Sequence, residues 1–213
     1  MDKLMKVKKV YSFWGKFPFL YYLQDFITFI GRPGFIRREA VKSLGLKKGD
    51  KVIEVACGNG RNFAYIMETI GQEGWLVGFD YSQEMLAAAE RLCRKKGWKN
   101  ITLIRGDAAE LNVNEKDFDG AISILGISAI PEWEKALLRC KDVLRVGGKL
   151  VICDARPFQG FLKFINPAIK AIYSRFAAWD PNKNIPEKMR EIFGNVQIET
   201  YNKNTFFIAR AAR

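Results

Sequence analysis

A short run of residues, Val52–Gly60, places an acid, a thiol and two glycines in an order that predicts a nucleotide-type pocket. Its apolar first half predicts a buried β-strand, and Gly58 and Gly60 predict a tight turn that opens a helix. Glycine in such a turn lets the backbone approach a ligand without a clash from Cβ. A second acid, Asp80, ends the next apolar run at residues 75–79. This order of strand, glycine turn, helix, strand and acid predicts a pocket at the carboxyl ends of the strands.

The spacing of the glycines restricts the kind of ligand. The dinucleotide fingerprint G-x-G-x-x-G requires a third glycine at position 63, where this chain has Phe63. The third glycine permits close packing of the helix on the strand around a pyrophosphate, so Phe63 argues against NAD and FAD. A ligand that contains adenosine but no pyrophosphate fits the sequence better.

The pocket depends on strands that alternate with helices along the chain. Such alternation predicts a doubly wound parallel sheet with right-handed crossovers. The last two strands are joined by Asn202-Lys203-Asn204 and form a hairpin, so they are antiparallel. The expected fold class is therefore α/β, with a mostly parallel seven-stranded sheet and a closing antiparallel hairpin. The predicted strands cover residues 51–55, 75–79, 101–105, 120–125, 149–153, 196–201 and 205–209.

Three helices between the strands are indicated by apolar periodicity and by residues typical of helix ends. In the first, residues 63–70 carry apolar side chains at positions i, i+3, i+4 and i+7. Ser82 is expected to cap the second helix, and Gly97 is expected to end it after a run of cations. The third helix is expected to begin at Pro131 and to stop at Gly147-Gly148.

In their order, the signals between about residues 40 and 155 resemble the class I S-adenosylmethionine-dependent methyltransferases. The glycine loop that starts at Glu54 resembles the first motif of that family, and Asp80 matches its ribose-binding acid. Gly106-Asp107-Ala108 matches its adenine-reading loop, and residues 144–150 resemble its lead into the fifth strand. The resemblance implies a Rossmann-like fold that binds S-adenosylmethionine and releases S-adenosylhomocysteine. The residues expected to bind this cofactor are Glu54, Ala56, Cys57, Gly58, Gly60, Asp80, Tyr81, Met85, Asp107, Ala108 and Leu125.

The resemblance also implies individual roles in this pocket. Asp80 is expected to accept hydrogen bonds from two ribose hydroxyls, and a hydrogen bond to a charged group contributes about 1.5–3 kcal/mol. Tyr81 and Met85 are expected to flank the adenine, Asp107 to read its amino edge, and Glu54 to lie near the methionine end. Simpler roles stay open for three of these residues. Glu54 could cap the glycine loop, Met85 could belong to the helix core, and Asp107 could cap a turn.

The composition excludes several kinds of catalytic site. The chain has 213 residues, enough for one domain, and no histidine, which rules out a histidine triad and the H-E-x-x-H zinc site. Its four cysteines form no C-x-x-C pair, which is typical of buried, reduced thiols in an intracellular protein. Methyl transfer from a sulfonium has a good leaving group, so no metal is expected. If the acceptor must lose a proton, the candidate catalytic residues are Tyr11, Tyr21 and Tyr22, with Asp154 and Asp180 as further candidates.

Charge divides the chain into a near-neutral middle and two basic flanks. Residues 1–48 hold 11 lysines and arginines against 3 acids, residues 49–154 hold 14 against 16, and residues 155–213 hold 10 against 4. We therefore expect an N-terminal basic, aromatic helical lid over residues 1–48. The cofactor-binding domain is expected to follow over residues 49–213, with a lid insertion at about 156–190.

Both flanks mix aromatic and basic residues, which favours an anionic membrane surface as a partner. The N-terminal segment has no convincing signal peptide, and its apolar run is short for a transmembrane helix. The predicted location is the cytoplasm, with peripheral contact at the inner face of the membrane. Pro167 is expected to kink the helix of the insertion. The apolar stripe of that insertion consists of Phe161, Leu162, Ile165, Ile169, Ile172, Tyr173 and Phe176.

The methyl acceptor is predicted only by class. Residues 37–52 and 201–209 resemble the quinone-biosynthesis C-methyltransferases and the soluble phospholipid N-methyltransferases, which implies a hydrophobic or amphipathic, lipid- or quinone-like small molecule. Residues 124–128 lack the (Asn/Asp)-Pro-Pro-aromatic motif of enzymes that methylate base amino groups, so nucleic acid is less favoured. An RNA methyltransferase is the first alternative, and a non-catalytic lipid- or anion-binding module is the second. The attacked atom (N, O or C) and the oligomeric state are left open.

Overall fold

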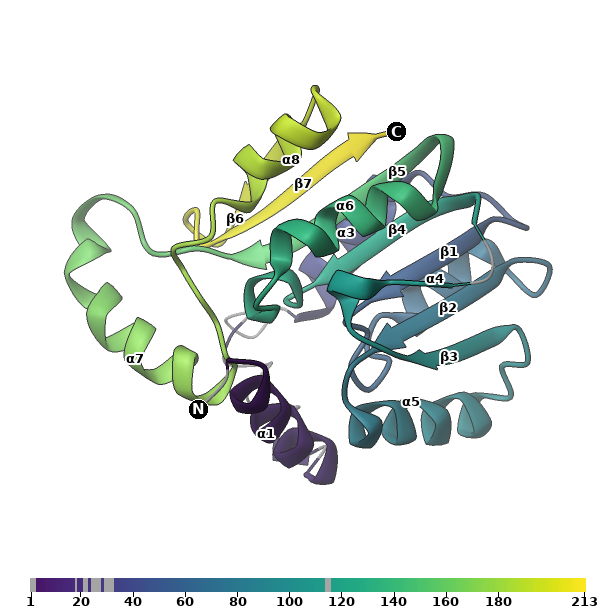
Figure 1. Ribbon diagram of the computed structural model, residues 1–213, viewed down its shortest axis with the longest axis horizontal. Coiled ribbons are helices and arrows are strands. Elements are labelled where there is room, and N and C mark those ends of the chain that lie inside the picture. Colours follow the sequence, from purple (N-terminus) through teal and green to yellow (C-terminus); the bar gives the residue numbers. More distant parts are fainter. Residues whose placement is uncertain (1–2, 18, 21–22, 24–27, 29–32, 114–115) are drawn as a thin grey trace.

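The residues that the structure describes form a seven-stranded sheet in the order β3-β2-β1-β4-β5-β7-β6 (Figure 1). The structure is a computed structural model that describes residues 3–17, 19–20, 23, 28, 33–113 and 116–213. Neighbouring strands from β3 to β5 are parallel, whereas β7 pairs antiparallel with both β5 and β6. The predicted fold class is therefore confirmed. The strands are β1 (Lys51–Val55), β2 (Trp75–Asp80), β3 (Ile101–Arg105), β4 (Phe118–Ile124), β5 (Leu144–Ala155), β6 (Gln197–Tyr201) and β7 (Phe206–Ala212).

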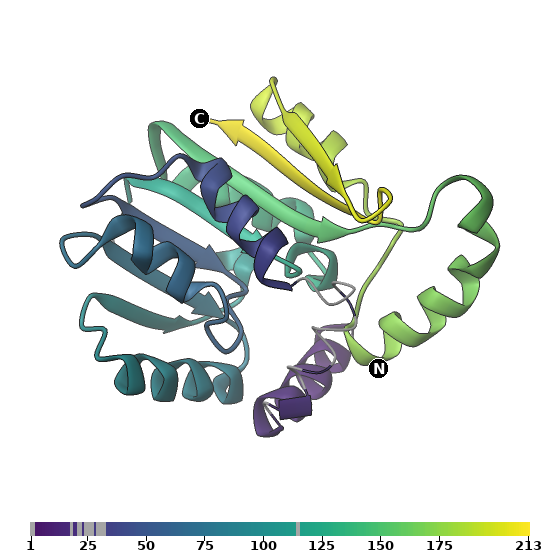
Figure 2. The same ribbon diagram turned by 180° about the vertical axis from the view of Figure 1, so that it is seen from behind.

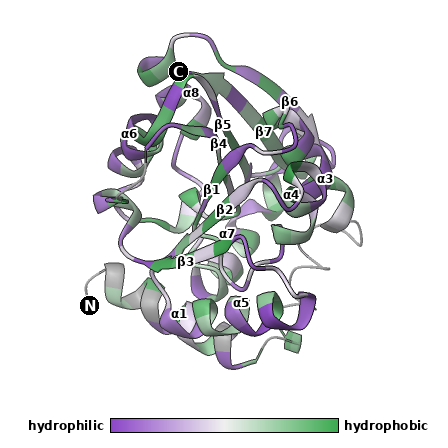
Figure 3. Cartoon of the chain, turned by 90° about the vertical axis from the view of Figure 1, so that its right-hand side faces the viewer, coloured by the Kyte–Doolittle hydropathy of each residue, from purple (hydrophilic) through white to green (hydrophobic). Residues whose placement is uncertain are grey.

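Helices cover both faces of this sheet, as the two opposite views in Figures 1 and 2 show. Side chains of β1 alternate between the faces, so Val52 packs towards α3, α4 and α5, whereas Ile53 and Val55 pack towards α6 and α8. In Figure 3, α5 and α6 carry both hydrophilic and hydrophobic segments, as expected of helices that bury one face. The helices are α1 (Lys3–Lys16), α3 (Pro33–Leu44), α4 (Phe63–Ile70), α5 (Gln83–Lys96), α6 (Trp133–Val143), α7 (Asn166–Phe176) and α8 (Ile185–Phe193), with 3₁₀ turns η1 (Ala108–Glu110), η2 (Ile127–Ala129) and η3 (Gly160–Ile165).

The predicted ends of two helices are confirmed. The apolar positions of α4 are all buried, which fixes this helix on the sheet directly after the glycine loop. Ser82 caps α5, because its hydroxyl accepts a hydrogen bond from the amide of Met85 at 3.3 Å. Gly97 ends the same helix in the left-handed conformation, with φ of 68°.

Two predicted helix boundaries and one predicted kink are wrong. Helix α6 begins at Trp133, two residues after Pro131, and it ends at Val143 before the glycine pair. Gly147 and Gly148 lie within β5 instead. This strand has a bulge where its partner on β4 changes from Phe118 to Gly120. Gly147 adopts a left-handed φ of 77°, which lets the strand continue through the bulge. Pro167 does not kink α7 but lies in its first turn, where a missing amide hydrogen costs no helical hydrogen bond.

Part of each of the two expected lid regions packs against a face of the sheet. Helix α3, within residues 1–48, buries Ile36 and Ala40 against the sheet, and α8 buries Ile185 and Met189 on the other side. The remaining elements, α1, η3 and α7, lie near the carboxyl ends of the parallel strands (Figure 1). No helix among the described residues is long and apolar enough to cross a membrane.

Candidate active site

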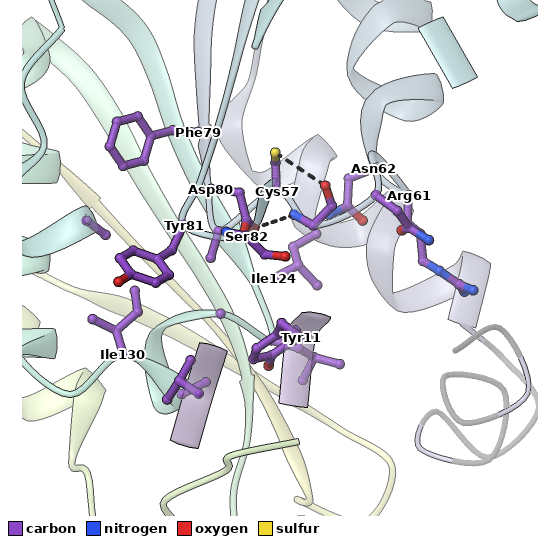
Figure 4. A pocket seen from close by; sticks show the side chains of 18 of the residues that line it. Tyr11, Cys57, Arg61, Asn62, Phe79, Asp80, Tyr81, Ser82, Ile124 and Ile130 are labelled. Carbon is purple, nitrogen blue, oxygen red and sulfur yellow. Dashed lines mark hydrogen bonds between the residues drawn. The ribbon is translucent and has the colours of Figure 1, made fainter. Parts of the chain in front are cut away.

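A cavity lies where β1 to β4 end, at the point in the sheet where successive connections leave in opposite directions. Ligands of doubly wound sheets bind at such a switch point. Figure 4 shows Tyr11 of α1, Asp80 and Tyr81 around this space, which we call the first cavity. It is lined by Val7, Tyr11, Arg37, Ala56, Cys57, Gly58, Asn59, Arg61, Asn62, Phe79, Asp80, Tyr81, Ser82, Gly106, Asp107, Ala108, Ile124, Leu125, Gly126, Ala129, Ile130 and Pro131.

Two loops in the wall of the first cavity adopt backbone conformations that side chains rarely take. Ala56 follows β1 with φ of 56°, and Leu125 follows β4 with φ of 58°. Gly126 allows the loops to touch, because a Cβ at this position would lie 2.6 Å from Cβ of Ala56 and 2.5 Å from Oγ of Ser123. Left-handed residues other than glycine are strained and cluster at functional sites. The location of this strain agrees with a ligand site at the first cavity.

Backbone amides hold the carboxylate of Asp80 on both sides. Its Oδ2 accepts a hydrogen bond from the amide of Gly58 at 2.7 Å, and its Oδ1 accepts one from the amide of Ser82 at 2.8 Å. Removal from water raises the pKa of Asp80, and these two amides and that of Tyr81 oppose the shift. A carboxylate has about four acceptor positions, so each oxygen can still accept from a ligand. A Cβ at Gly58 would meet no atom within 4 Å, so this glycine leaves open space beside the acid.

The ring of Phe63 is buried directly beneath the glycine loop. A Cβ at Gly60 in the loop would lie 2.7 Å from this ring, and so would a Cβ at Gly78 in β2. Two glycines therefore make room for the aromatic ring between the loop and the sheet. Helix α4 packs on the strands through a large side chain at position 63 and not through the third glycine of a dinucleotide site.

Three polar side chains form a buried chain behind the glycine loop. Asn62 donates a hydrogen bond to Oε1 of Glu54, and Arg37 donates one to Oδ1 of Asn62 at 2.5 Å. Burial raises the pKa of Glu54 to about 8, although the Asn62 hydrogen bond and the charge of Arg37 oppose the shift. Asn62 stands at the N-cap of α4, but its side chain makes no capping bond. These hydrogen bonds connect Glu54 to Asn62 and Arg37, which both line the first cavity.

The structure brings eight of the eleven predicted cofactor residues to the first cavity. One of them, Asp107, also caps η1, since its Oδ1 accepts a hydrogen bond from the amide of Ala109 at 2.9 Å. Capping and ligand contact are compatible, because only one carboxylate oxygen takes part in the cap. The eight residues are Ala56, Cys57, Gly58, Asp80, Tyr81, Asp107, Ala108 and Leu125.

The other three predicted residues do not line the first cavity. Glu54 lies behind the loop, and Gly60 faces the ring of Phe63. Met85 is fully buried in the first turn of α5, where its amide donates to the cap. Contacts of these three residues with a ligand therefore stay predictions.

The candidate proton acceptors lie in different surroundings. Tyr11 lines the first cavity, and Asp154 lines a second cavity described below. Asp180 is partly exposed and lines neither. Tyr21 and Tyr22 lie outside the described residues.

A second cavity, of about 280 Å³, lies beside the first at the carboxyl ends of β4 and β5. Leu125 lines both cavities. The rings of Tyr173 and Trp179 meet edge to face in its wall, with centroids 6.3 Å apart. One buried water requires only ~10–15 Å³, so the second cavity has room for a small organic molecule. It is lined by Thr28, Leu125, Ser128, Asp154, Ala155, Arg156, Phe158, Ile169, Tyr173, Ala177, Trp179, Thr205 and Phe206.

Asp154 is a fully buried acid in the wall of the second cavity. Its Oδ1 accepts hydrogen bonds from the Ser128 hydroxyl at 2.7 Å and the Ala155 amide at 2.8 Å, and its Oδ2 accepts one from the Ser128 amide at 2.9 Å. Burial raises the pKa of Asp154, while these hydrogen bonds and the charge of Lys183 oppose the shift. With three protein donors, the carboxylate retains capacity for about one more hydrogen bond.

Sequence reasoning did not identify Arg37 as a site residue and did not predict the second cavity. Arg37 precedes Asn62 by 25 positions, and the resemblance over residues 37–52 gave it no role in the pocket. The apolar stripe of the insertion indicated Ile169 and Tyr173 as a buried face, but periodicity cannot show that this face lies beside Asp154.

Comparisons with known proteins agree with this geometry. A family model described as "Methyltransferase domain" matches residues 46–203. A demethylmenaquinone methyltransferase of Staphylococcus carnosus is 28% identical over 148 residues, which cover 65% of this chain and 61% of that protein. Another, from Anoxybacillus flavithermus, is 24% identical over 196 residues, which cover 81% of each chain.

A solved structure extends the likeness to the fold. The crystal structure of an S-adenosylmethionine-dependent methyltransferase from Aquifex aeolicus has a TM-score of 0.64 and 18% identity, over 82% of this chain and 88% of that one. At this level of identity, the similarity concerns the fold alone.

Proposed function

The chain belongs to the methyltransferase domain family and is an S-adenosylmethionine-dependent enzyme, and from this premise we propose that it methylates a hydrophobic or amphipathic, quinone-like small molecule. The observation that carries the proposal is the second cavity, which is rich in aromatic side chains and meets the first at Leu125. In this proposal, the first cavity holds the methyl donor and the second holds the acceptor. The acceptor atom must then lie against the methyl group of the donor beside Leu125, where the two cavities meet.

The side chains of the first cavity fit S-adenosylmethionine. The carboxylate of Asp80 has free acceptor positions for ribose hydroxyls, and Arg37 supplies a buried positive charge for the ligand's carboxylate. The buried Oδ1 of Asn59 has no hydrogen-bond partner among the described residues, so it is available to the ligand's ammonium group. Tyr81 offers a ring for the adenine. When bound, S-adenosylmethionine supplies an electrophilic methyl group on a sulfonium.

The second cavity fits an aromatic acceptor with a hydroxyl group. The relatives reported above are named for demethylmenaquinone, a quinone, and Tyr173 and Trp179 provide surfaces on which such a ring can pack. Asp154 is the one acid among the described residues that line the second cavity, and it has capacity for one more hydrogen bond. We assign to it the acceptance of a hydroxyl proton from the acceptor, which raises the electron density of the atom that is methylated.

One experiment tests the donor and acceptor assignments together. Purified wild type, Asp80→Ala and Asp154→Asn are compared for S-adenosylhomocysteine affinity by calorimetry and for transfer of a labelled methyl group to a short-chain naphthoquinol. Asp80→Ala is expected to weaken the affinity at least tenfold, because two ribose hydrogen bonds to a charged acceptor are lost. Asp154→Asn is expected to retain the affinity and to lose most of the turnover.

The control for both variants is Asp142→Asn, which alters an exposed acid of α6 that pairs with Arg139. Unchanged affinity in Asp80→Ala would contradict the ribose assignment. Full turnover in Asp154→Asn would contradict the proton assignment. A wild type that fails to bind S-adenosylhomocysteine would favour the non-catalytic module. Binding of RNA that weakens steeply with salt, without turnover of the quinol, would favour the RNA methyltransferase.

A further inference from the structure

The segment at the rim of the second cavity is basic, aromatic and exposed. Residues 155–179 contain four lysines and arginines and no aspartate or glutamate. No residue of η3 or α7 within this segment is fully buried. Phe161 and Phe164 are 88% and 67% exposed, far more than large rings normally are on a surface that faces water. Figure 1 shows α7 standing away from the sheet.

The apolar stripe of helix α7 has two edges with different surroundings. Ile169 and Tyr173, one turn apart, line the second cavity. Ile172 and Phe176, also one turn apart, are each 51% exposed. The same short helix therefore lines the second cavity with one edge of its apolar stripe and exposes the other edge.

The positive charges around this stripe favour an anionic binding partner. Lys163, Lys170 and Arg175 are exposed on the same segment and match an anionic surface. A second copy of the chain would bring like charges together across a two-fold axis, which is unfavourable. Single-stranded nucleic acid could stack on the phenylalanine rings but would gain little from the aliphatic Ile172. Apolar rings and aliphatic groups among cations are typical of a helix in the interface of a bilayer.

We propose that residues 156–179 dock on an anionic phospholipid bilayer and that the methyl acceptor passes from the bilayer into the second cavity along α7. The proposal rests on the proposed function for the identity of that cavity. The phenylalanine rings enter the headgroup region, and the lysines lie near lipid phosphates. Helix α7 has 11 residues and is ~16 Å long, about half the ~30 Å of a hydrocarbon core, so it lies in the interface.

Vesicle flotation of the full chain tests the docking surface. Wild type is expected to float with vesicles of phosphatidylglycerol and phosphatidylcholine, and more weakly with phosphatidylcholine alone. The variant Phe161→Ser/Phe164→Ser is expected to lower the partition coefficient at least tenfold. The matched control is Val146→Ser, because Val146 is 84% exposed but belongs to the opposite end of β5.

A second pair of variants tests the electrostatic part. Lys163→Glu/Lys170→Glu is expected to reduce binding to anionic vesicles much more than Lys95→Glu/Lys99→Glu, which makes the same change of net charge elsewhere on the surface. An equal loss of vesicle binding in the two lysine variants would overturn the docking surface. So would flotation of Phe161→Ser/Phe164→Ser to the same extent as the wild type. Retention on RNA without flotation of the wild type would overturn it in favour of a nucleic acid.

Two further measurements separate this proposal from the proposed function. S-adenosylhomocysteine affinity and turnover of a dispersed short-chain naphthoquinol are expected to persist in Phe161→Ser/Phe164→Ser, whereas turnover of a long-chain quinol held in vesicles is expected to fall at least fivefold. Loss of both kinds of turnover in this variant would contradict the docking role. Absence of turnover with either quinol in the wild type would count against the proposed acceptor, and the flotation comparison would still decide whether the surface docks.

Discussion

At the scale of single residues, three acids at or behind the two cavities differ in how their charge is compensated: Glu54, Asp80 and Asp154. Protein hydrogen-bond donors compensate Asp154 on both oxygens, and two backbone amides do the same for Asp80. Glu54 is different, because Asn62 bonds only its Oε1 and its Oε2 has no partner among the described residues. With its pKa raised to about 8, Glu54 is mostly protonated near neutral pH in the folded protein.

This pKa predicts that the free energy of unfolding depends on pH. The substitution Glu54→Gln should make that dependence weaker. The unfolded chain releases the Glu54 proton near pH 4.5, whereas the folded chain retains it up to about pH 8. The folded state binds more protons within this window, so the free energy of unfolding falls as pH rises from about 4.5 to 8. Glutamine keeps the shape and the hydrogen bond to Asn62 without this cost, so the variant is expected to be more stable at pH 8–9, on the order of a few kcal/mol.

Urea unfolding of both proteins between pH 5 and pH 9 measures the effect. Asp154 contributes equally to both proteins and cancels in the difference between variant and wild type, which reports Glu54 together with its coupling to Asp80. A difference that stays constant across this pH range would contradict the assignment of a raised pKa.

At the scale of elements, the packing of α4 on the sheet decides the shape of the glycine loop. Phe63 fills the space above Gly78 in β2 and below Gly60 in the loop. The sequence predicted that Phe63 replaces the third glycine of a dinucleotide site and lies on the apolar face of this helix, but it did not predict the packing of the ring on Gly78. Local signals failed at Gly147, where pairing of β5 with β4 overrides the tendency of glycine to end a segment.

The packing around Phe63 predicts the effect of Gly78→Ala. The added Cβ would lie 2.7 Å from the ring, and overpacking of this kind costs about 1–3 kcal/mol. The variant should also weaken S-adenosylhomocysteine binding, because displacement of the ring shifts the glycine loop. In a Phe63→Leu background the same substitution is expected to cost less, with the 2.9 Å approach of the Cβ to Cδ2 of Leu103 still present, and thermal unfolding and calorimetry can measure the difference.

The matched control for this substitution is Gly34→Ala in α3. Its Cβ would lie 3.0 Å from the flexible end of Tyr65, so little loss of stability is expected. Equal destabilisation by Gly78→Ala in both backgrounds would show that the ring is not the obstacle.

At the scale of the whole molecule, α1 connects elements that are far apart in the sequence. Its Ser12 hydroxyl donates to Glu84 of α5 at 2.8 Å. Two other side chains of α1 contact the end of α7. The Tyr11 hydroxyl donates to the carbonyl of Ala177 at 3.1 Å, and Nε1 of Trp14 donates to the carbonyl of Phe176 at 2.6 Å. Helix α1 therefore contacts the first cavity and fastens the segment that lines the second.

Deletion of residues 1–16 is expected to affect both cavities. The deletion removes Val7 and Tyr11 from the wall of the first cavity and removes the hydrogen bonds that hold the end of α7. S-adenosylhomocysteine affinity should fall several-fold, and trypsin should cleave the segment 156–179 at least fivefold faster. Trp14→Phe, which removes one hydrogen bond to α7, should accelerate cleavage less and leave the affinity nearly unchanged. If trypsin cleaved the truncated chain at the same rate as the wild type, the fastening role of α1 would be contradicted.

The sequence by itself determined the sheet class, the glycine loop after β1 and eight residues of the first cavity, because glycine spacing, strand-end acids and helix caps act over a few residues. It also indicated an amphipathic segment at 156–190, although not what this segment faces. Only the tertiary structure brought Arg37 to the glycine loop, joined Tyr11 to Ala177 across 166 positions, and placed Asp154 beside Trp179 in the second cavity. These contacts depend on strand order and on the packing of distant helices, which no local periodicity contains.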